Sequence, residues 1–255
     1  MSKPPVIDQL VLDLQTVGVR PGGVLMVHSS LKSLGAFPGG AESLIQGLLA
    51  AIAPEGTLLM PALSYETVIP QKPVFDIRST PSCVGILPEI FRLSAGTRRS
   101  MHPTHSVCAV GPLTSDLLSP HILDSTPCGP NSPFHRLADF KGQILMLGCG
   151  LRPNTSMHAI EEIAQTPYLL NPPMRFTLID ENGQKTQKSY APHNFKNISQ
   201  RYDRVEKVLA YPQLRTGGVL KAKVHLIEAN ALKDCVLQAL EKDPWFFVDV
   251  LNQVD

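Results

Sequence analysis

The sequence predicts an α/β fold, with a mostly parallel or mixed central sheet flanked by helices. Short apolar runs over Val24–Val27, Thr57–Pro61 and Gln143–Leu147 are typical of buried strands. Between the first two runs, Ala41–Ala53 repeats its apolar residues at helical spacing and ends before Pro54. Strand, helix and strand in this order predict a βαβ unit and therefore a parallel strand pair.

The remaining elements follow in chain order from the same periodicities. Helices are expected over Val6–Val17, Cys83–Ser94, Leu113–Leu118, Thr155 to about Gln165, Ile198–Ala210 and Ala231–Leu240. Strands are expected over Ser106–Val110 and Lys221–Glu228, and a β-hairpin over Phe176–Asp180 and Thr186–Tyr190. Proline-bearing loops are expected over Ser64–Ser79 and Thr126–Phe134. We expect one domain over residues 1–255, with a hairpin-bearing C-terminal part at about 168–228.

Charge and cysteine content exclude several classes of function. A net charge of +1 gives no basic surface for nucleic acid or an anionic membrane. No apolar run approaches the ~18 residues that span a bilayer, and polar residues interrupt Val6–Leu14, unlike a secretory leader. The five isolated cysteines favour reduced thiols in a cytoplasmic protein. Four or five of them are expected to be buried.

The segment Asn154–Glu161 carries the most informative chemical pattern. It follows the predicted strand end at Leu145–Gly150, and open α/β sheets bind ligands beyond such ends. On a helix, His158 and Glu161 share one face. A carboxylate beside an imidazole fixes its tautomer and raises its basicity, which makes the pair a candidate general base. The same spacing also occurs by chance in surface pairs.

Three loops combine small polar residues with strand ends, namely His28–Gly35, His102–Val107 and Gly129–Pro133. They suit a polar or phosphate-bearing ligand, although ordinary helix capping also accounts for each of them. The glycine-rich signatures of P-loops, dinucleotide-binding folds and serine hydrolases are missing from the sequence. A zinc hydrolase is an alternative that the histidines leave open, with the ligands His102, His105, His158 and Glu161.

An ordered set of motifs resembles the aminoglycoside 3-N-acetyltransferase family, whose α/β fold differs from that of the GNAT acetyltransferases. The resemblance covers most of the chain and is densest from Val24 to Glu161. The matching blocks are Val27–Gly35, Gly39–Glu42, Gly56–Pro61, Gly85–Arg92, Arg99–Gly111, Gly129–Pro133, Leu145–Gly148 and Asn154–Glu161.

The resemblance implies transfer of an acetyl group from acetyl-CoA to the 3-amine of a 2-deoxystreptamine aminoglycoside, without a metal or an acetyl-enzyme. It implies that His158 is the general base and Glu161 its orienting carboxylate. The residues implied along the coenzyme A channel are His28, Ser29, Ser30, Leu31, Lys32, Ser33, Leu34, Gly35, Ser106 and Val107. The loop amides or the Ser106 hydroxyl are the candidate oxyanion donors.

The acceptor side departs from the family pattern. Many members carry a longer, acidic insertion where this chain has only Ser64–Phe75. The carboxylates predicted to bind a cationic acceptor are Glu66, Asp76, Glu162 and Asp203. Two alternatives stay open: an acyltransferase for a non-antibiotic amine, and a coenzyme A-binding protein without catalysis. Cys108 is the alternative nucleophile, although its strand position favours burial. A monomer or a homodimer is expected.

Overall fold

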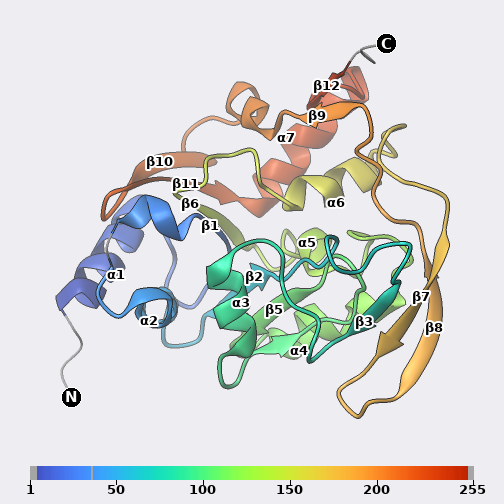
Figure 1. Cartoon of the computed structure of the whole chain (residues 1–255). Coiled ribbons are helices and arrows are strands. Elements are labelled where there is room, and N and C mark those ends of the chain that lie inside the picture. The colour runs from blue at the N-terminus through green and yellow to red at the C-terminus, as the bar shows by residue number, and fades with distance from the viewer. Residues whose placement is uncertain (1–4, 36, 252–255) are drawn as a thin grey trace.

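The computed structural model describes residues 5–35 and 37–251. A seven-stranded sheet forms its centre, in the order β10-β11-β6-β1-β2-β5-β4 (Figure 1). Its strands are β1 (Val24–Ser29), β2 (Thr57–Pro61), β4 (Arg98–Arg99), β5 (Val107–Val110), β6 (Gln143–Leu147), β10 (Leu214–Val219) and β11 (Ala222–Glu228). β1 runs parallel to β2 and β6, and the other neighbours are antiparallel. The predicted α/β class and the parallel pair are confirmed.

Helices cover both faces of this sheet. One face carries α1 (Pro5–Val17), α2 (Gly40–Ile52) and α3 (Ile86–Leu93), and the other carries α4 (Thr114–Leu118), α5 (Pro133–Arg136), α6 (Ser156–Ile163) and α7 (Ala229–Lys242). Side chains of a strand alternate between faces, so Leu25 and Val27 pack toward the first set and Met26 toward the second. By the same alternation, His28 faces the side that carries α6.

A smaller sheet lies beside the central one and contains the predicted hairpin (Figure 1). Strands β7 (Met174–Ile179) and β8 (Lys185–Tyr190) pair antiparallel, and Gly183 has the positive φ of 81° that their turn requires. β3 (Val74–Asp76) lies inside the segment predicted as a loop and runs parallel to β7. This short strand escaped prediction because its partner lies about a hundred residues further along the chain.

The predicted helix over Ile198–Ala210 is wrong. The segment forms β9 (Ile198–Gln200) and then the 3₁₀ helix η3 (Tyr202–Lys207), and β9 pairs with β12 (Val248–Val250). Two further 3₁₀ helices, η1 (Leu31–Leu34) and η2 (Ser119–Leu123), follow β1 and α4. Tyr202 and Val205 are buried at a spacing of three, which fits a 3₁₀ helix as well as an α-helix. Sequence periodicity therefore could not separate the two.

Two smaller expectations also need correction. α3 begins at Ile86, later than the predicted Cys83, so that Pro88 lies in the first helical turn, where proline is tolerated. All five cysteines are free, but only Cys108 and Cys128 are buried, so the expectation of four or five buried thiols is wrong. Within residues 5–35 and 37–251, no helix is both long and apolar enough to cross a membrane.

Candidate active site

Segments distant in the sequence meet where β1, β2 and β6 end. Because Pro61 at the end of β2 pairs with Val107 at the start of β5, the loop after β2 lies beside the loop before β5. The amide of Ser64 donates to the carbonyl of Thr104 at 2.9 Å, which joins these two loops. α6 follows β6, so His158 reaches the same edge of the sheet as His105.

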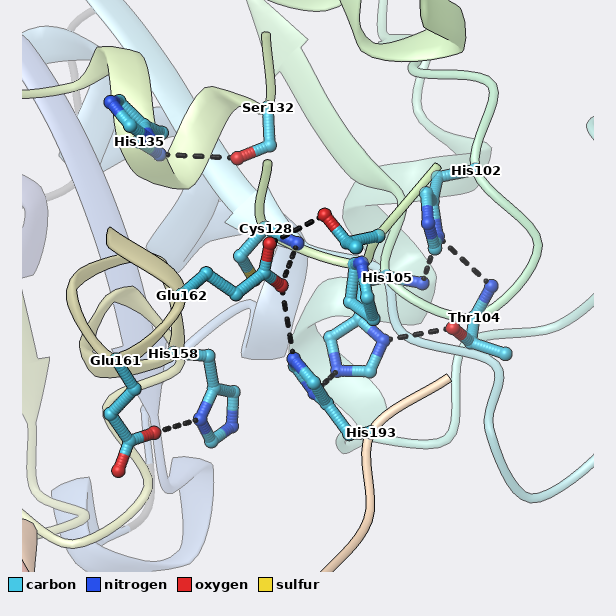
Figure 2. Close-up of polar contacts among 12 residues, drawn as sticks. His102, Thr104, His105, Cys128, Ser132, His135, His158, Glu161, Glu162 and His193 are labelled. Atoms are coloured by element: carbon cyan, nitrogen blue, oxygen red, sulfur yellow. Dashed lines mark hydrogen bonds and ion pairs between the residues drawn. The ribbon is translucent and has the colours of Figure 1, made fainter. Parts of the chain in front are cut away.

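Glu161 lies at the centre of a buried hydrogen-bond network. Its carboxylate is fully buried, and its Oε1 accepts the hydroxyl of Tyr168 at 2.8 Å. Its Oε2 accepts the hydroxyl of Tyr202 at 2.7 Å. The same oxygen lies 3.1 Å from Nδ1 of His158, one helical turn earlier (Figure 2). The Tyr202 hydroxyl oxygen also lies 2.8 Å from this nitrogen.

This network determines which nitrogen of His158 carries the hydrogen. A carboxylate can only accept, so the contact with Glu161 requires a hydrogen on Nδ1. The Nε2 atom then keeps its lone pair. His158 lines the large cavity described next, so this imidazole borders space that a substrate can enter.

The cavity beside His158 has a volume of about 550 Å³. Its wall is largely apolar and includes Leu63, Val68, Met174, Phe176 and Phe195. Polar groups come from residues such as Asn154, Asn171 and Gln200, and the only cation among its described lining residues is Arg152. No carboxylate lies among the described lining residues. The wall therefore offers apolar contacts and hydrogen bonds but no negative charge.

A second chain of polar contacts runs beside the first (Figure 2). His193 lies three residues after β8, and its Nδ1 is 3.1 Å from Nε2 of His105. Its Nε2 is 3.3 Å from Oε1 of Glu162, and its ring centroid is 4.6 Å from that of His158. Burial and the neighbouring imidazoles hold the pKa values of His105 and His193 well below the usual range. Both rings are therefore neutral near pH 7. Burial raises the pKa of Glu162 to about 7.

The loop predicted to line the coenzyme A channel begins on the α6 side of β1 with His28, whereas Leu34 near its other end packs on the side of α1 and α2. His28 is buried, and burial together with nearby His158 lowers its pKa to about 3. The Ser33 hydroxyl donates to the carbonyl of Gly148 at 2.6 Å, which ties η1 to the end of β6. The lining residues of the 550 Å³ cavity include none from His28–Gly35. The role of this loop stays a prediction.

Ser106 and Val107 are both fully buried. The Ser106 hydroxyl donates to the carbonyl of Ala62 at 2.8 Å and accepts a hydrogen bond from Nε of Arg99. This hydroxyl therefore already has partners. Asn154, by contrast, has a hydrogen-bond donor without a partner. Its Oδ1 accepts the Ser156 amide at 3.1 Å, while its buried Nδ2 has no hydrogen-bond partner within the described chain.

The four carboxylates predicted for the acceptor have different surroundings. Glu66 is exposed, and Asp76 accepts hydrogen bonds from backbone amides of its own turn. Asp203 binds the guanidinium of Arg201. Glu162 lines a separate hollow of about 480 Å³ near the Gly129–Pro133 loop. None of the four lines the cavity beside His158, and their role also stays a prediction.

The predicted zinc ligand set does not assemble. His102 stacks on His121 at a centroid distance of 4.8 Å, and its Nδ1 accepts the backbone amides of Thr104 and His105. The carboxylate of Glu161 is already occupied by tyrosine hydroxyls and His158. Cys108 is fully buried in β5, and burial raises its pKa to about 12, which disfavours a thiolate nucleophile.

Several site residues were not predicted from the sequence. Tyr168, Tyr202 and His193 all follow the region of dense motifs, and no local spacing connects them with His158. Tyr202 was assigned to a helix that does not form. An isolated tyrosine or histidine in a polar segment carries no signal until the fold brings it to a partner.

A buried carboxylate that orients an imidazole beside a cavity is the arrangement of enzymes that use a general base. The model of a family described as aminoglycoside 3-N-acetyltransferase matches residues 26–241. A curated relative, aminoglycoside N(3)-acetyltransferase IV from a Salmonella species, is 32% identical over 243 residues, which cover 94% of this chain and 89% of the relative. The chain belongs to the aminoglycoside 3-N-acetyltransferase family.

Solved structures agree with this assignment. A crystal structure of aminoglycoside acetyltransferase AAC(3)-IVa, a mutant in complex with a gentamicin, superposes with a TM-score of 0.82 at 30% identity, covering 97% of this chain and 92% of that one. AAC-IIIb in a binary complex with CoASH superposes with a TM-score of 0.81 at 27% identity, covering 92% and 96%. The fold and the enzyme class predicted from the motifs are confirmed.

Proposed function

We propose that this protein transfers an acetyl group from acetyl-CoA directly to an amine, with the 3-amine of a 2-deoxystreptamine aminoglycoside as the acceptor. One observation carries the proposal, namely the hydrogen-bond network around His158. Tyr168 and Tyr202 hold the Glu161 carboxylate, and this carboxylate orients His158 beside the cavity so that Nε2 keeps its lone pair. The relatives with CoASH and a gentamicin bound support the donor and acceptor classes.

His158 supplies the proton transfer that the reaction needs. An alkyl ammonium has a pKa of about 10.4, so the acceptor must lose a proton before its nitrogen attacks the thioester. This first proton leaves to solvent. As the C–N bond forms, Nε2 accepts a second proton from the nitrogen, and the resulting imidazolium is stabilised through Nδ1 by Glu161. When the C–S bond breaks, the proton passes to the departing thiolate. No covalent acetyl-enzyme is involved.

The transition state also needs donors for the thioester oxygen, which becomes negatively charged. Asn154 is the side chain best suited to this role, because Ser156 fixes its amide and leaves Nδ2 without a partner. The amides of the His28–Gly35 loop are the further candidates, and this loop and Ser106–Val107 remain the proposed coenzyme A-binding segments. The five free cysteines support a cytoplasmic location.

One observation favours a second acceptor class. The cavity beside His158 includes residues of the short Ser64–Phe75 segment, but none of its described lining residues is a carboxylate. A polycationic antibiotic gains little from such a wall, whereas an amine with an apolar body fits it. An anionic group on the acceptor could also form an ion pair with the Arg152 guanidinium, which lines this cavity. An apolar, non-antibiotic amine is therefore the alternative acceptor.

A product assay across both acceptor classes tests these proposals. Wild type is incubated with acetyl-CoA and either a panel of aminoglycosides or a panel of apolar amines, and mass spectrometry detects the acetylated amine. Turnover of aminoglycosides supports the first acceptor, and turnover of apolar amines alone supports the second. His158→Ala should lose at least the ~10²-fold that a positioned base contributes. Undiminished turnover by this variant, or tight coenzyme A binding without transfer to any amine, would overturn the mechanism.

A further inference from the structure

Three imidazoles from separate parts of the chain converge at one point beside the cavity. His105 precedes β5, His158 lies on α6, and His193 follows β8. One nitrogen from each ring lies within 4.8 Å of the other two, and the pair from His105 and His193 is already 3.1 Å apart. A tetrahedral zinc ion with Zn–N bonds of about 2.0–2.1 Å holds its ligand nitrogens about 3.4 Å apart. Small ring rotations therefore suffice to close this triad around a metal ion.

In each ring, the nitrogen that is not directed at the other two imidazoles contacts a further side chain, called the outer partner here (Figure 2). Nδ1 of His158 contacts the Glu161 carboxylate, and Nε2 of His193 contacts the Glu162 carboxylate. Nδ1 of His105 lies 2.9 Å from the Thr104 hydroxyl. Metal-binding histidines almost always hold a carboxylate, carbonyl or water in this way, because the outer partner fixes the ring and increases the basicity of the nitrogen that binds the metal.

We propose that His105, His158 and His193 form a binding site for a divalent transition-metal ion such as Zn²⁺, and that an ion bound there blocks acyl transfer. The metal would bind Nε2 of His105, Nε2 of His158 and Nδ1 of His193. The cavity gives the ion an entry path and space for a water molecule as the fourth ligand. His105 only has to carry its hydrogen on Nδ1, where the Thr104 oxygen accepts it.

A competing ligand set shares His193 but is less suitable. Cys128, Glu162 and His193 also place ligand atoms within 4.8 Å of one another. Cys128 is fully buried, and burial together with nearby Glu162 raises its pKa well above the usual range. A metal binds the thiolate, so this environment works against the competing set. The three-histidine set needs no thiolate and lies beside the cavity.

Inhibition follows from the chemistry of Nε2, and this part of the inference depends on the proposed function. The lone pair that would take the acceptor's proton is the one that would bind the metal, so the two events are mutually exclusive. Metal binding by the three rings is independent of any activity and can be measured alone.

Calorimetry with metal-free protein and Zn²⁺ tests the site directly. Wild type should bind one ion, and zinc should raise its unfolding temperature by mass action. Loss of an outer partner typically weakens metal binding ~10–100-fold, so Glu162→Gln should weaken zinc binding within this range. His105→Gln and His193→Gln remove a ligand and should weaken zinc binding by more than that. Cys128→Ser is the control for the competing set. His135→Gln is the matched histidine control, because His135 lies on α5 outside the cluster.

The spectrum of the Co²⁺ form and a product assay complete the test. The cobalt form should show the visible bands of a tetrahedral nitrogen–oxygen site without a thiolate charge-transfer band. Zinc should suppress formation of the acetylated amine, measured by mass spectrometry because zinc also binds free thiols. Absence of zinc binding, or binding lost in Cys128→Ser but retained in His105→Gln, would overturn the site. Binding without inhibition would leave the site standing and count against His158 as the base.

Discussion

Replacement of Glu161 by glutamine tests the mechanism at its buried centre. The substitution keeps the size of the side chain and removes its charge and one of its two acceptor oxygens. In the native site, Tyr168 donates to one oxygen, and the other serves both Tyr202 and Nδ1 of His158. An amide has only one oxygen, so it cannot serve all three donors.

The expected loss of rate follows from the tautomer. If the new amide nitrogen of Glu161→Gln faces His158, it donates a hydrogen bond that Nδ1 must accept. The ring hydrogen then moves to Nε2, which is the nitrogen that should take the acceptor's proton. If the amide oxygen faces His158, the tautomer survives but the imidazolium loses its negative partner. A wrong tautomer costs about 10⁴-fold in kcat in the triad of serine proteases, and a positioned base contributes about 10²–10⁴-fold in all. We expect kcat to fall by about 10²–10⁴-fold.

The assay is product formation at saturating acetyl-CoA and acceptor, beside thermal unfolding of the same protein. One tyrosine hydroxyl of the variant loses its acceptor, which should cost about 1–3 kcal/mol of unfolding free energy. The variant should therefore remain folded, with KM for acetyl-CoA unchanged because Glu161 is fully buried and belongs to neither proposed coenzyme A-binding segment. A folded variant with wild-type kcat would refute the assignment of Glu161 as the orienting carboxylate.

The remaining predictions concern the tyrosines, an ion pair and a buried thiol. Tyr202→Phe should lower kcat more than Tyr168→Phe, because only the Tyr202 hydroxyl also contacts the imidazole nitrogen; equal losses would contradict this division. Glu89→Gln should cost about 1–2 kcal/mol in denaturant unfolding, because the carboxylate holds Arg92 through both oxygens. Arg92 lowers the pKa of Glu89 in the folded state, so this stabilisation is present above the unfolded pKa of about 4.3 and should disappear as the pH falls further. Alkylation of Cys108 in the native protein should be slower than that of the partly exposed cysteines; rapid labelling in peptide mass spectrometry would contradict its burial.

The sequence predicted the site residues that are close to one another along the chain. His158 and Glu161 lie on one helix three residues apart, so their contact follows from helical spacing alone. Tyr202 lies 41 residues beyond Glu161, and its placement depends on β9 and η3 rather than on the helix that its spacing suggested. His193 reaches His105 across 88 residues, through the hairpin of the second sheet.

The proposed proton transfer and the choice of acceptor depend on different parts of the site. The contacts around Glu161 are buried and satisfied within the chain, so changes in the cavity wall can leave the proposed base intact. The wall itself comes from irregular segments around Tyr65, Arg152, Asn171 and Phe195, where length and composition are weakly constrained by the central sheet. Family membership therefore supports the acyl transfer strongly, whereas the acceptor depends on the segments in which this chain departs from the family pattern. Because none of the described wall residues is a carboxylate, the wall favours an acceptor that carries few positive charges.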